Sequence, residues 1–196
     1  MEDPIKDIAR MQELGDNQHV IKCVEALEDE ENIYIITPKA KAGTLTEAIG
    51  FRLPGKSLSF MLSWIHQRRS TNQLKVWKIF RQIVEVLKYL EAHGICHHDL
   101  SPDNFVFLTE DNLVVIDLAL SIKMPVGQNG SRTLIKPKGA FGKVVWMDPL
   151  VFGGVLSKEL GTFDGVSYDL WAAALMLYSM VTGQLLYQRP WPTERS

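Results

Sequence analysis

The feature that most constrains this fold is a long amphipathic segment in the middle of the chain, which ends at Gly94. Its apolar residues are Leu74, Val76, Ile79, Phe80, Ile83, Val84, Leu87 and Leu90. They follow the 3.6-residue period of an α-helix and so share one face of it, and glycine commonly follows a helix end. A second segment, from Tyr168 to Thr182, is almost wholly apolar, which predicts a helix buried all round that ends at Gly183. The fold must therefore bury two long helices.

Shorter patterns predict that strands accompany these helices in an α+β fold. Pro4 begins an amphipathic helix that Gly15 ends. Residues 46–72 mix glycine and proline with a short apolar helix at 60–65, and residues 121–142 form the longest predicted loop. Runs of β-branched and aromatic residues predict two pairs of strands, each joined by a polar turn, over residues 20–26 and 32–37 and over 105–108 and 113–116.

The composition is that of one soluble globular domain, with 46% apolar and 22% charged residues. A net charge of -2 gives no general attraction to nucleic acid or to anionic membranes, and no segment has the length and polarity of a membrane span. The two cysteines are far apart and have apolar neighbours, which favours reduced, structural thiols. These features predict a cytoplasmic protein, with the nucleus as an alternative, and no nucleic-acid or membrane partner.

Three polar side chains lie where chemistry is expected. Asp99 and Asn104 belong to the stretch His-His-Asp-Leu-Ser-Pro-Asp-Asn between the long helix and the second strand pair, and Asp117 directly follows that pair. The three side chains should therefore converge at one edge of a small sheet. Phosphoryl transfer needs an acceptor for the proton of the attacking hydroxyl and oxygen ligands for Mg²⁺. Asp99 suits the first role, and Asn104 and Asp117 suit the second.

These residues resemble the H-R-D-L-x-x-x-N catalytic loop and the D-F-G metal site of eukaryotic-type protein kinases. Further along the chain, Gly142 to Pro149 resembles the G-T-x-x-Y-M-A-P-E end of an activation segment, and Tyr168-Asp169-Leu170-Trp171 resembles the start of the central buried helix. The motifs follow the family's order, and the similarity runs from the first helix to about Gly183. A single His-x-Asp with a later Asn would be weak, but matches in this order are specific.

The resemblance implies a site for ATP and Mg²⁺ and a protein substrate. Asp99 would be the catalytic base, Asn104 would serve both catalysis and metal binding, Asp117 would bind metal, and Asp169 would anchor the catalytic loop. Val106 would lie under the adenine, and Thr37 would be the gatekeeper. The hinge from Pro38 to Ala40, including Lys39, would bond the base through its backbone. Residues 1–45 would form a partial N-lobe and hinge, and residues 46–196 a partial, mostly helical C-lobe.

The sequence departs from the family pattern at several places. No G-x-G-x-x-G loop and no V-A-I-K lysine precede the first helix, and the last helices of the family do not follow Gly183, so the domain is expected to be incomplete at both ends. Asp7 takes the place of the glutamate that pairs with that lysine. Four replacements are His98 for arginine, Ser101 for the lysine that contacts the transferred phosphate, Ala119 for glycine and Leu150 for glutamate. The changes at 98 and 101 remove positive charge from the site.

Three functions remain open at this point. The first is a serine/threonine protein kinase, because Ser-Pro-Asp-Asn is closer to K-P-E-N than to the tyrosine-kinase A-A-R-N. The second is an inactive, pseudokinase-like scaffold that binds protein partners, which the missing phosphate-binding elements favour. The third is a small-molecule phosphotransferase of the aminoglycoside or choline type, which also uses His-x-Asp, Asn and a later Asp. The segment Trp146-Met147-Asp148-Pro149 argues against this third reading.

Overall fold

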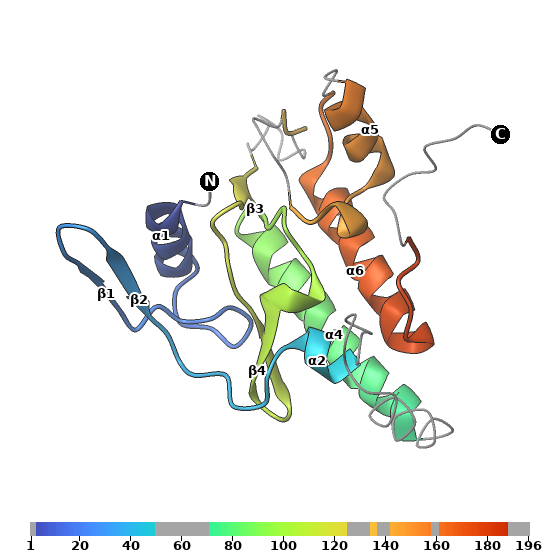
Figure 1. The fold of residues 1–196 in the computed structure, drawn as a ribbon, viewed down its shortest axis with the longest axis horizontal. Coiled ribbons are helices and arrows are strands. Elements are labelled where there is room, and N and C mark those ends of the chain that lie inside the picture. The colour runs from blue at the N-terminus through green and yellow to red at the C-terminus, as the bar shows by residue number, and fades with distance from the viewer. Residues whose placement is uncertain (1–2, 50–70, 125–133, 137–141, 158–160, 188–196) are drawn as a thin grey trace.

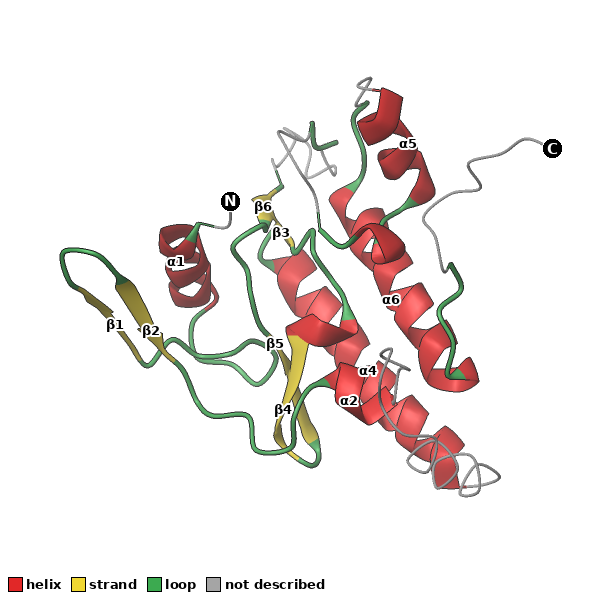
Figure 2. Ribbon diagram, viewed as in Figure 1, coloured by secondary structure: helices red, strands yellow, loops and turns green. Residues whose placement is uncertain are grey.

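The computed structural model describes residues 3–49, 71–124, 134–136, 142–157 and 161–187 (Figures 1 and 2). In chain order its elements are α1 (Pro4–Leu14), β1 (Glu25–Glu28), β2 (Ile33–Ile36), α2 (Leu45–Ile49), α4 (Thr71–Ala92), β3 (Ile95–Cys96), the 3₁₀ turn η1 (Pro102–Asn104), β4 (Phe105–Thr109), β5 (Asn112–Val115), β6 (Ile122–Lys123), the 3₁₀ turn η2 (Val144–Trp146), α5 (Pro149–Ser157) and α6 (Gly165–Thr182). The expected α+β class is confirmed, with a helix and a strand pair ahead of a mostly helical part.

The two long helices form the centre of the fold. The prediction that the second of them is buried all round is wrong, because Leu170, Tyr178 and Val181 of α6 are exposed on one face. Figure 1 shows α4 and α6 side by side, and the two helices contact each other along their length. Ile83 and Val86 of α4 and Ala173 and Met176 of α6 are fully buried in the same core. Burial of these side chains removes apolar surface from water, which stabilises the fold by about 25 cal/mol per Å².

The helix ends have the caps that their sequences indicate. The Asp3 carboxylate accepts hydrogen bonds from the amides of Ile5 and Lys6 at the start of α1, and Gly15 ends that helix with a φ of 67°. Helix α6 starts at the cap Asp164 and ends at Gly183, which has a left-handed φ of 71°. A side chain at that φ is strained, so glycine is the natural end residue.

The described residues form three small antiparallel sheets, and one predicted strand is wrong in its extent. The pairs are β1 with β2, β3 with β6, and β4 with β5. The strand expected over residues 20–26 begins only at Glu25, where it pairs with Ile36. Val20 instead forms a parallel bridge with Val115 of β5, and the amide of Ile21 donates to the carbonyl of Val115 at 2.9 Å. The apolar start of this segment therefore packs on the core.

Several elements were not predicted from the sequence. They are the short helix α2, the helix α5 and the two-residue pairing of β3 with β6. The helix predicted at 60–65 and most of the loop predicted at 121–142 lie outside the described residues. The division of the chain at residue 45 stays a prediction.

Candidate active site

The predicted catalytic residues lie on the loop between β3 and η1, which carries Asp99, and on η1, which ends at Asn104. Helix α6 binds the backbone of this loop. Asp169, which is 4% exposed, accepts hydrogen bonds from the amide of His97 at 2.7 Å and from the amide of His98 at 3.0 Å. Both bonds are charge-assisted and buried, which makes them stronger than bonds between neutral groups. The carboxylate of Asp169 therefore fixes the backbone directly before Asp99.

His97 links this loop to the segment before Asp117. Its Nε2 donates to the carbonyl of Ile116 at 3.1 Å, and its Nδ1 accepts from the amide of Asp99 at 3.3 Å. Together these bonds fix the tautomer with the proton on Nε2. The amide of Ile116 in turn donates to the carbonyl of Asn104 at 2.9 Å. The backbone at Asp99, Asn104 and Ile116 is thereby joined into one network.

Asp99 and Asn104 are brought together, as the sequence predicts. The Nδ2 of Asn104 donates to the carbonyl of Asp99 at 2.8 Å and to its Oδ2 at 3.0 Å. The other carboxylate oxygen of Asp99, Oδ1, accepts from the amide of Lys143 at 2.9 Å. Both side chains are buried, with 6% and 5% exposed. Because Asn104 donates through its nitrogen, its Oδ1 is directed away from Asp99 and toward other partners.

Lys143 was not singled out in the sequence, and it enters the same cluster. Its Nζ donates to the Ser101 hydroxyl at 2.9 Å and to Asn104 Oδ1 at 3.3 Å, and lies 3.6 Å from Asp99 Oδ2. The preceding residue, Gly142, lies so close to the loop that a Cβ there would be 2.4 Å from Asp99 Oδ1 and 3.0 Å from its Cα. Glycine is therefore needed for this close approach.

Asp117 lies two residues after β5 and has a left-handed backbone conformation, which is uncommon for residues other than glycine. Its φ is 63°, and among the described residues other than glycine only His98, with a φ of 72°, shares a positive value. Backbone strain of this kind tends to occur at functional sites. The following amide, of Leu118, donates to the carboxylate of Asp7 on α1 at 2.7 Å. Ala119 has no positive φ, so the alanine that replaces the family glycine is accommodated without that strain.

The residues predicted to hold the nucleotide lie on β4 and on the linker that follows β2. Val106 is 7% exposed in that strand. The linker after β2 runs alongside it, since the amide of Ala42 donates to the carbonyl of Phe107 at 3.3 Å and Thr44 bridges to Val106. Thr37 and Lys39 are exposed at the start of this linker, and Ala40 packs partly against the core. Their predicted contacts with ATP stay a prediction.

Comparison with known proteins identifies the family of this fold. A family model described as a protein kinase domain matches residues 2–195. The chain belongs to the protein kinase domain family.

The relatives of this kinase domain are protein kinases at low identity. It is 26% identical over 165 residues to sperm motility kinase Z of Mus musculus, covering 84% of this chain and 27% of the relative. It is 27% identical over 186 residues to calcium/calmodulin-dependent serine/threonine-protein kinase 1 of Oryza sativa subsp. japonica, covering 93% and 26%. It is 30% identical over 171 residues to calcium-dependent protein kinase 3 of Plasmodium yoelii yoelii, covering 86% and 26%. The kinase domain thus spans about a quarter of the length of these relatives.

His98 occupies the family's arginine position as a buried aromatic residue. Its ring stacks on Phe163 at a centroid distance of 5.6 Å and tilts against Tyr168 at 5.1 Å. Burial lowers the pKa of His98 to about 4. The ring is therefore uncharged near neutral pH, and it cannot grip a phosphate as a guanidinium does.

The buried histidine should make the kinase domain sensitive to acid. His98 binds its proton less readily in the folded protein, where its pKa is about 4, than in the unfolded chain, where it is about 6.5. The free energy of unfolding therefore falls as the pH drops from the unfolded-state pKa toward the folded-state pKa. Between pH 7 and pH 5 it should fall by about 2 kcal/mol. Urea unfolding of the wild type and of His98→Asn at both pH values measures it. Asparagine tolerates a positive φ and does not titrate, so an equal loss in both proteins would contradict this assignment.

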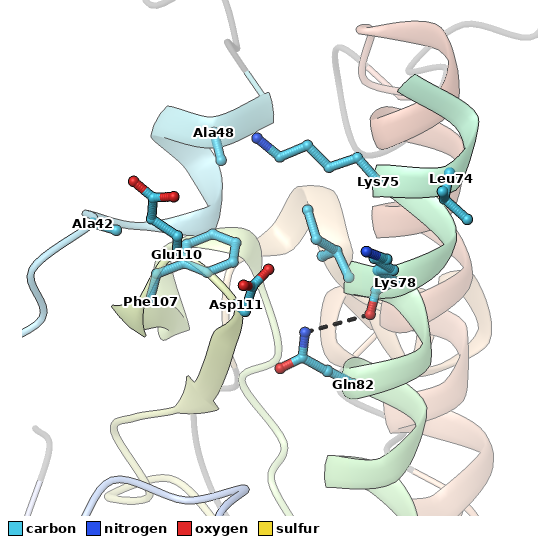
Figure 3. A pocket seen from close by; sticks show the side chains of 10 residues that line it. Ala42, Ala48, Leu74, Lys75, Lys78, Gln82, Phe107, Glu110 and Asp111 are labelled. Carbon is cyan, nitrogen blue, oxygen red and sulfur yellow. Dashed lines mark hydrogen bonds between the residues drawn. The ribbon is translucent and has the colours of Figure 1, made fainter. Parts of the chain in front are cut away.

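One hollow beside the described elements lies away from these residues. It has a volume of about 530 Å³ and lies between α2, α4 and the β4–β5 turn. Figure 3 shows Lys75 and Lys78 of α4 on one side and Glu110 and Asp111 of the turn on the other. None of Asp99, Asn104 and Asp117 lines it. The hollow therefore does not belong to the candidate active site.

The described residues include neither a cluster of metal-ligating side chains nor a membrane-spanning helix. They contain no group of three or more His, Cys, Asp and Glu side chains placed to hold a metal ion. Mg²⁺ commonly needs only one or two carboxylates, with waters and substrate phosphates as its other ligands. None of the helices in the described part of the chain has the length and apolarity to cross a bilayer. The cytoplasmic or nuclear compartment stays a prediction.

Proposed function

We propose that this kinase domain transfers the γ-phosphoryl group of Mg-ATP to a serine or threonine hydroxyl of a protein substrate. The observation that carries the proposal is the position of Asp99, whose two carboxylate oxygens accept separate hydrogen bonds from Lys143 and Asn104. These bonds orient the carboxylate, which can still accept the proton of a substrate hydroxyl. A base held in this way can align a hydroxyl and take up its proton.

Asn104 and Asp117 are the residues that would hold Mg²⁺. The donor set fits, because both offer the hard oxygen atoms that this ion prefers. The local structure supports Asn104, since its Nδ2 is occupied by Asp99 and its Oδ1 already faces a cation, the Lys143 ammonium. When bound, the metal neutralises charge on the phosphates during transfer. Val106, Thr37, Lys39 and Ala40 would contact the adenine end of the nucleotide.

Specificity for serine and threonine is part of the proposal. The loop sequence Ser-Pro-Asp-Asn is closer to the serine/threonine-kinase pattern than to the tyrosine-kinase pattern. One relative carries serine/threonine-protein kinase in its name.

A thermal-shift titration with ATP, with and without Mg²⁺, tests the nucleotide site. Ligand that binds only the folded protein stabilises it by about 2.7 kcal/mol at a hundredfold excess over its Kd. For a domain of this size that raises Tm by roughly 5–10 °C. We expect a rise that requires Mg²⁺ in the wild type and that Asp117→Asn abolishes.

Asp148→Asn is the control for this experiment, since Asp148 caps α5 through the amide of Leu150. This variant should keep the Mg²⁺-dependent rise. A wild type that melts cooperatively and shows no shift with Mg-ATP would exclude the proposed activity and favour a scaffold without catalysis.

A further inference from the structure

Ser101 stands where a lysine that contacts the transferred phosphate is expected, yet a lysine ammonium lies at this position in space. Ser101 is fully buried, and its hydroxyl accepts a hydrogen bond from Lys143 Nζ at 2.9 Å. Lys143 lies 42 residues further along the chain, in the segment that ends at α5. The charge missing from the catalytic loop is thus supplied by a different segment.

Backbone contacts fix the position from which the Lys143 side chain enters the site. Its amide donates to Asp99 Oδ1, and the close approach of Gly142 to Asp99 sets the path of the chain just before it. The ammonium then lies 3.3 Å from Asn104 Oδ1, 3.6 Å from Asp99 Oδ2 and 4.0 Å from Asp103 Oδ2. One positive charge therefore lies among the same oxygens that are proposed to act on the hydroxyl and the metal.

The contacts of the ammonium leave it able to bind a further anion. It has three N–H donors. In the described part of the chain, two oxygens lie within hydrogen-bond distance, those of Ser101 and Asn104, and both belong to neutral side chains. The carboxylates of Asp99 and Asp103 lie further away, and the lysine side chain is 40% exposed. A lysine whose only role was to neutralise Asp99 would be expected to have that carboxylate as its nearest partner.

We propose that Lys143 contacts the γ-phosphoryl group of ATP, in place of a lysine in the catalytic loop; this inference rests on the proposed function. In the transfer, the bond between the γ-phosphorus and the oxygen bridging it to the β-phosphate breaks, and a bond forms between the γ-phosphorus and the substrate oxygen. The hydroxyl proton moves to Asp99, and ADP leaves with the electron pair of the broken bond. The Lys143 ammonium stabilises the negative charge on the γ-phosphoryl oxygens.

The test compares ATP with ADP, because only ATP has the γ-phosphate. Dissociation constants of Mg-ATP and Mg-ADP are measured for the full chain, for Lys143→Met and for the control Lys88→Met. Lys88 is an exposed lysine of α4, paired with Glu85. We expect Lys143→Met to weaken Mg-ATP binding roughly 10- to 100-fold, as for loss of a charged hydrogen bond, and to leave Mg-ADP binding unchanged. Lys88→Met should change neither.

A charge exchange keeps the test valid if Lys143→Met folds poorly. The double variant Ser101→Lys/Lys143→Ser puts the ammonium back on the catalytic loop and should restore the preference for Mg-ATP over Mg-ADP. An unchanged ATP-to-ADP ratio in Lys143→Met, or a double variant that fails to regain it while folded, overturns the role of Lys143 and leaves the proposed activity standing. Wild type that binds neither nucleotide overturns both.

Discussion

Replacing Asp169 by alanine is expected to lower the free energy of unfolding by about 3 kcal/mol and Tm by roughly 6–12 °C. The substitution leaves the buried amides of His97 and His98 without their acceptor. Each such amide costs about 1–3 kcal/mol. Part of the loss is recovered because a buried carboxylate disappears, and burial already raises the pKa of Asp169 and so disfavours its charge.

Asp164→Ala is the matched control, since Asp164 is a carboxylate of the same helix that caps its first turn. A lost cap costs about 1 kcal/mol. Urea unfolding of both variants gives the comparison. Asp169→Asn should fall between the wild type and Asp169→Ala, because asparagine keeps one acceptor oxygen. A loss in Asp169→Ala no larger than that in Asp164→Ala would contradict the anchoring role.

Asp99→Asn is expected to slow phosphoryl transfer by about 100- to 10,000-fold, the usual contribution of a general base. The amide cannot take up the proton of the substrate hydroxyl. In the variant, the NH₂ group of the new side chain would also face another hydrogen-bond donor, because Lys143 and Asn104 each donate to one carboxylate oxygen of Asp99. Affinity for Mg-ATP should change little, because Asp99 is not among the proposed metal ligands.

Transfer of labelled γ-phosphate to a serine-containing and a threonine-containing protein measures this effect. Asp111→Asn, an exposed carboxylate in the β4–β5 turn, should transfer at the wild-type rate. An Asp99→Asn protein that keeps the wild-type rate would remove Asp99 from the mechanism, whereas loss of Mg-ATP binding in that variant would point to a structural role.

The elements that the sequence predicted well are those whose pattern repeats over several turns. The period of α4 and the apolar run of α6, each followed by a glycine, gave the two central helices. The pairing of β3 with β6 spans two residues on each strand, too few for any alternation to be visible. Helix α5 contains Gly153 and Gly154, residues of low helix propensity, so its sequence gave no helical signal.

The candidate site could be predicted only where its residues belong to one short motif. Asp99 and Asn104 are five positions apart in the catalytic loop, and their hydrogen bond follows from that local spacing. Lys143 is 42 positions from Ser101, and no spacing rule connects them. One signal was present: Gly142-Lys143 departs from the family's G-T in the same chain in which Ser101 departs from lysine. Two departures can compensate for each other, and only the folded chain shows that they meet.

Because α6 anchors the catalytic loop, the ribosome makes the loop before it makes the anchor. A nascent chain emerges from its N-terminus, so His97 is made 72 residues before the carboxylate that its amide binds. Contacts between residues so far apart in sequence form slowly, because closing a long loop must come first. During synthesis the loop therefore stays without its support until α6 has left the ribosome. Any polypeptide that stops short of α6 lacks the carboxylate that fixes the backbone directly before Asp99.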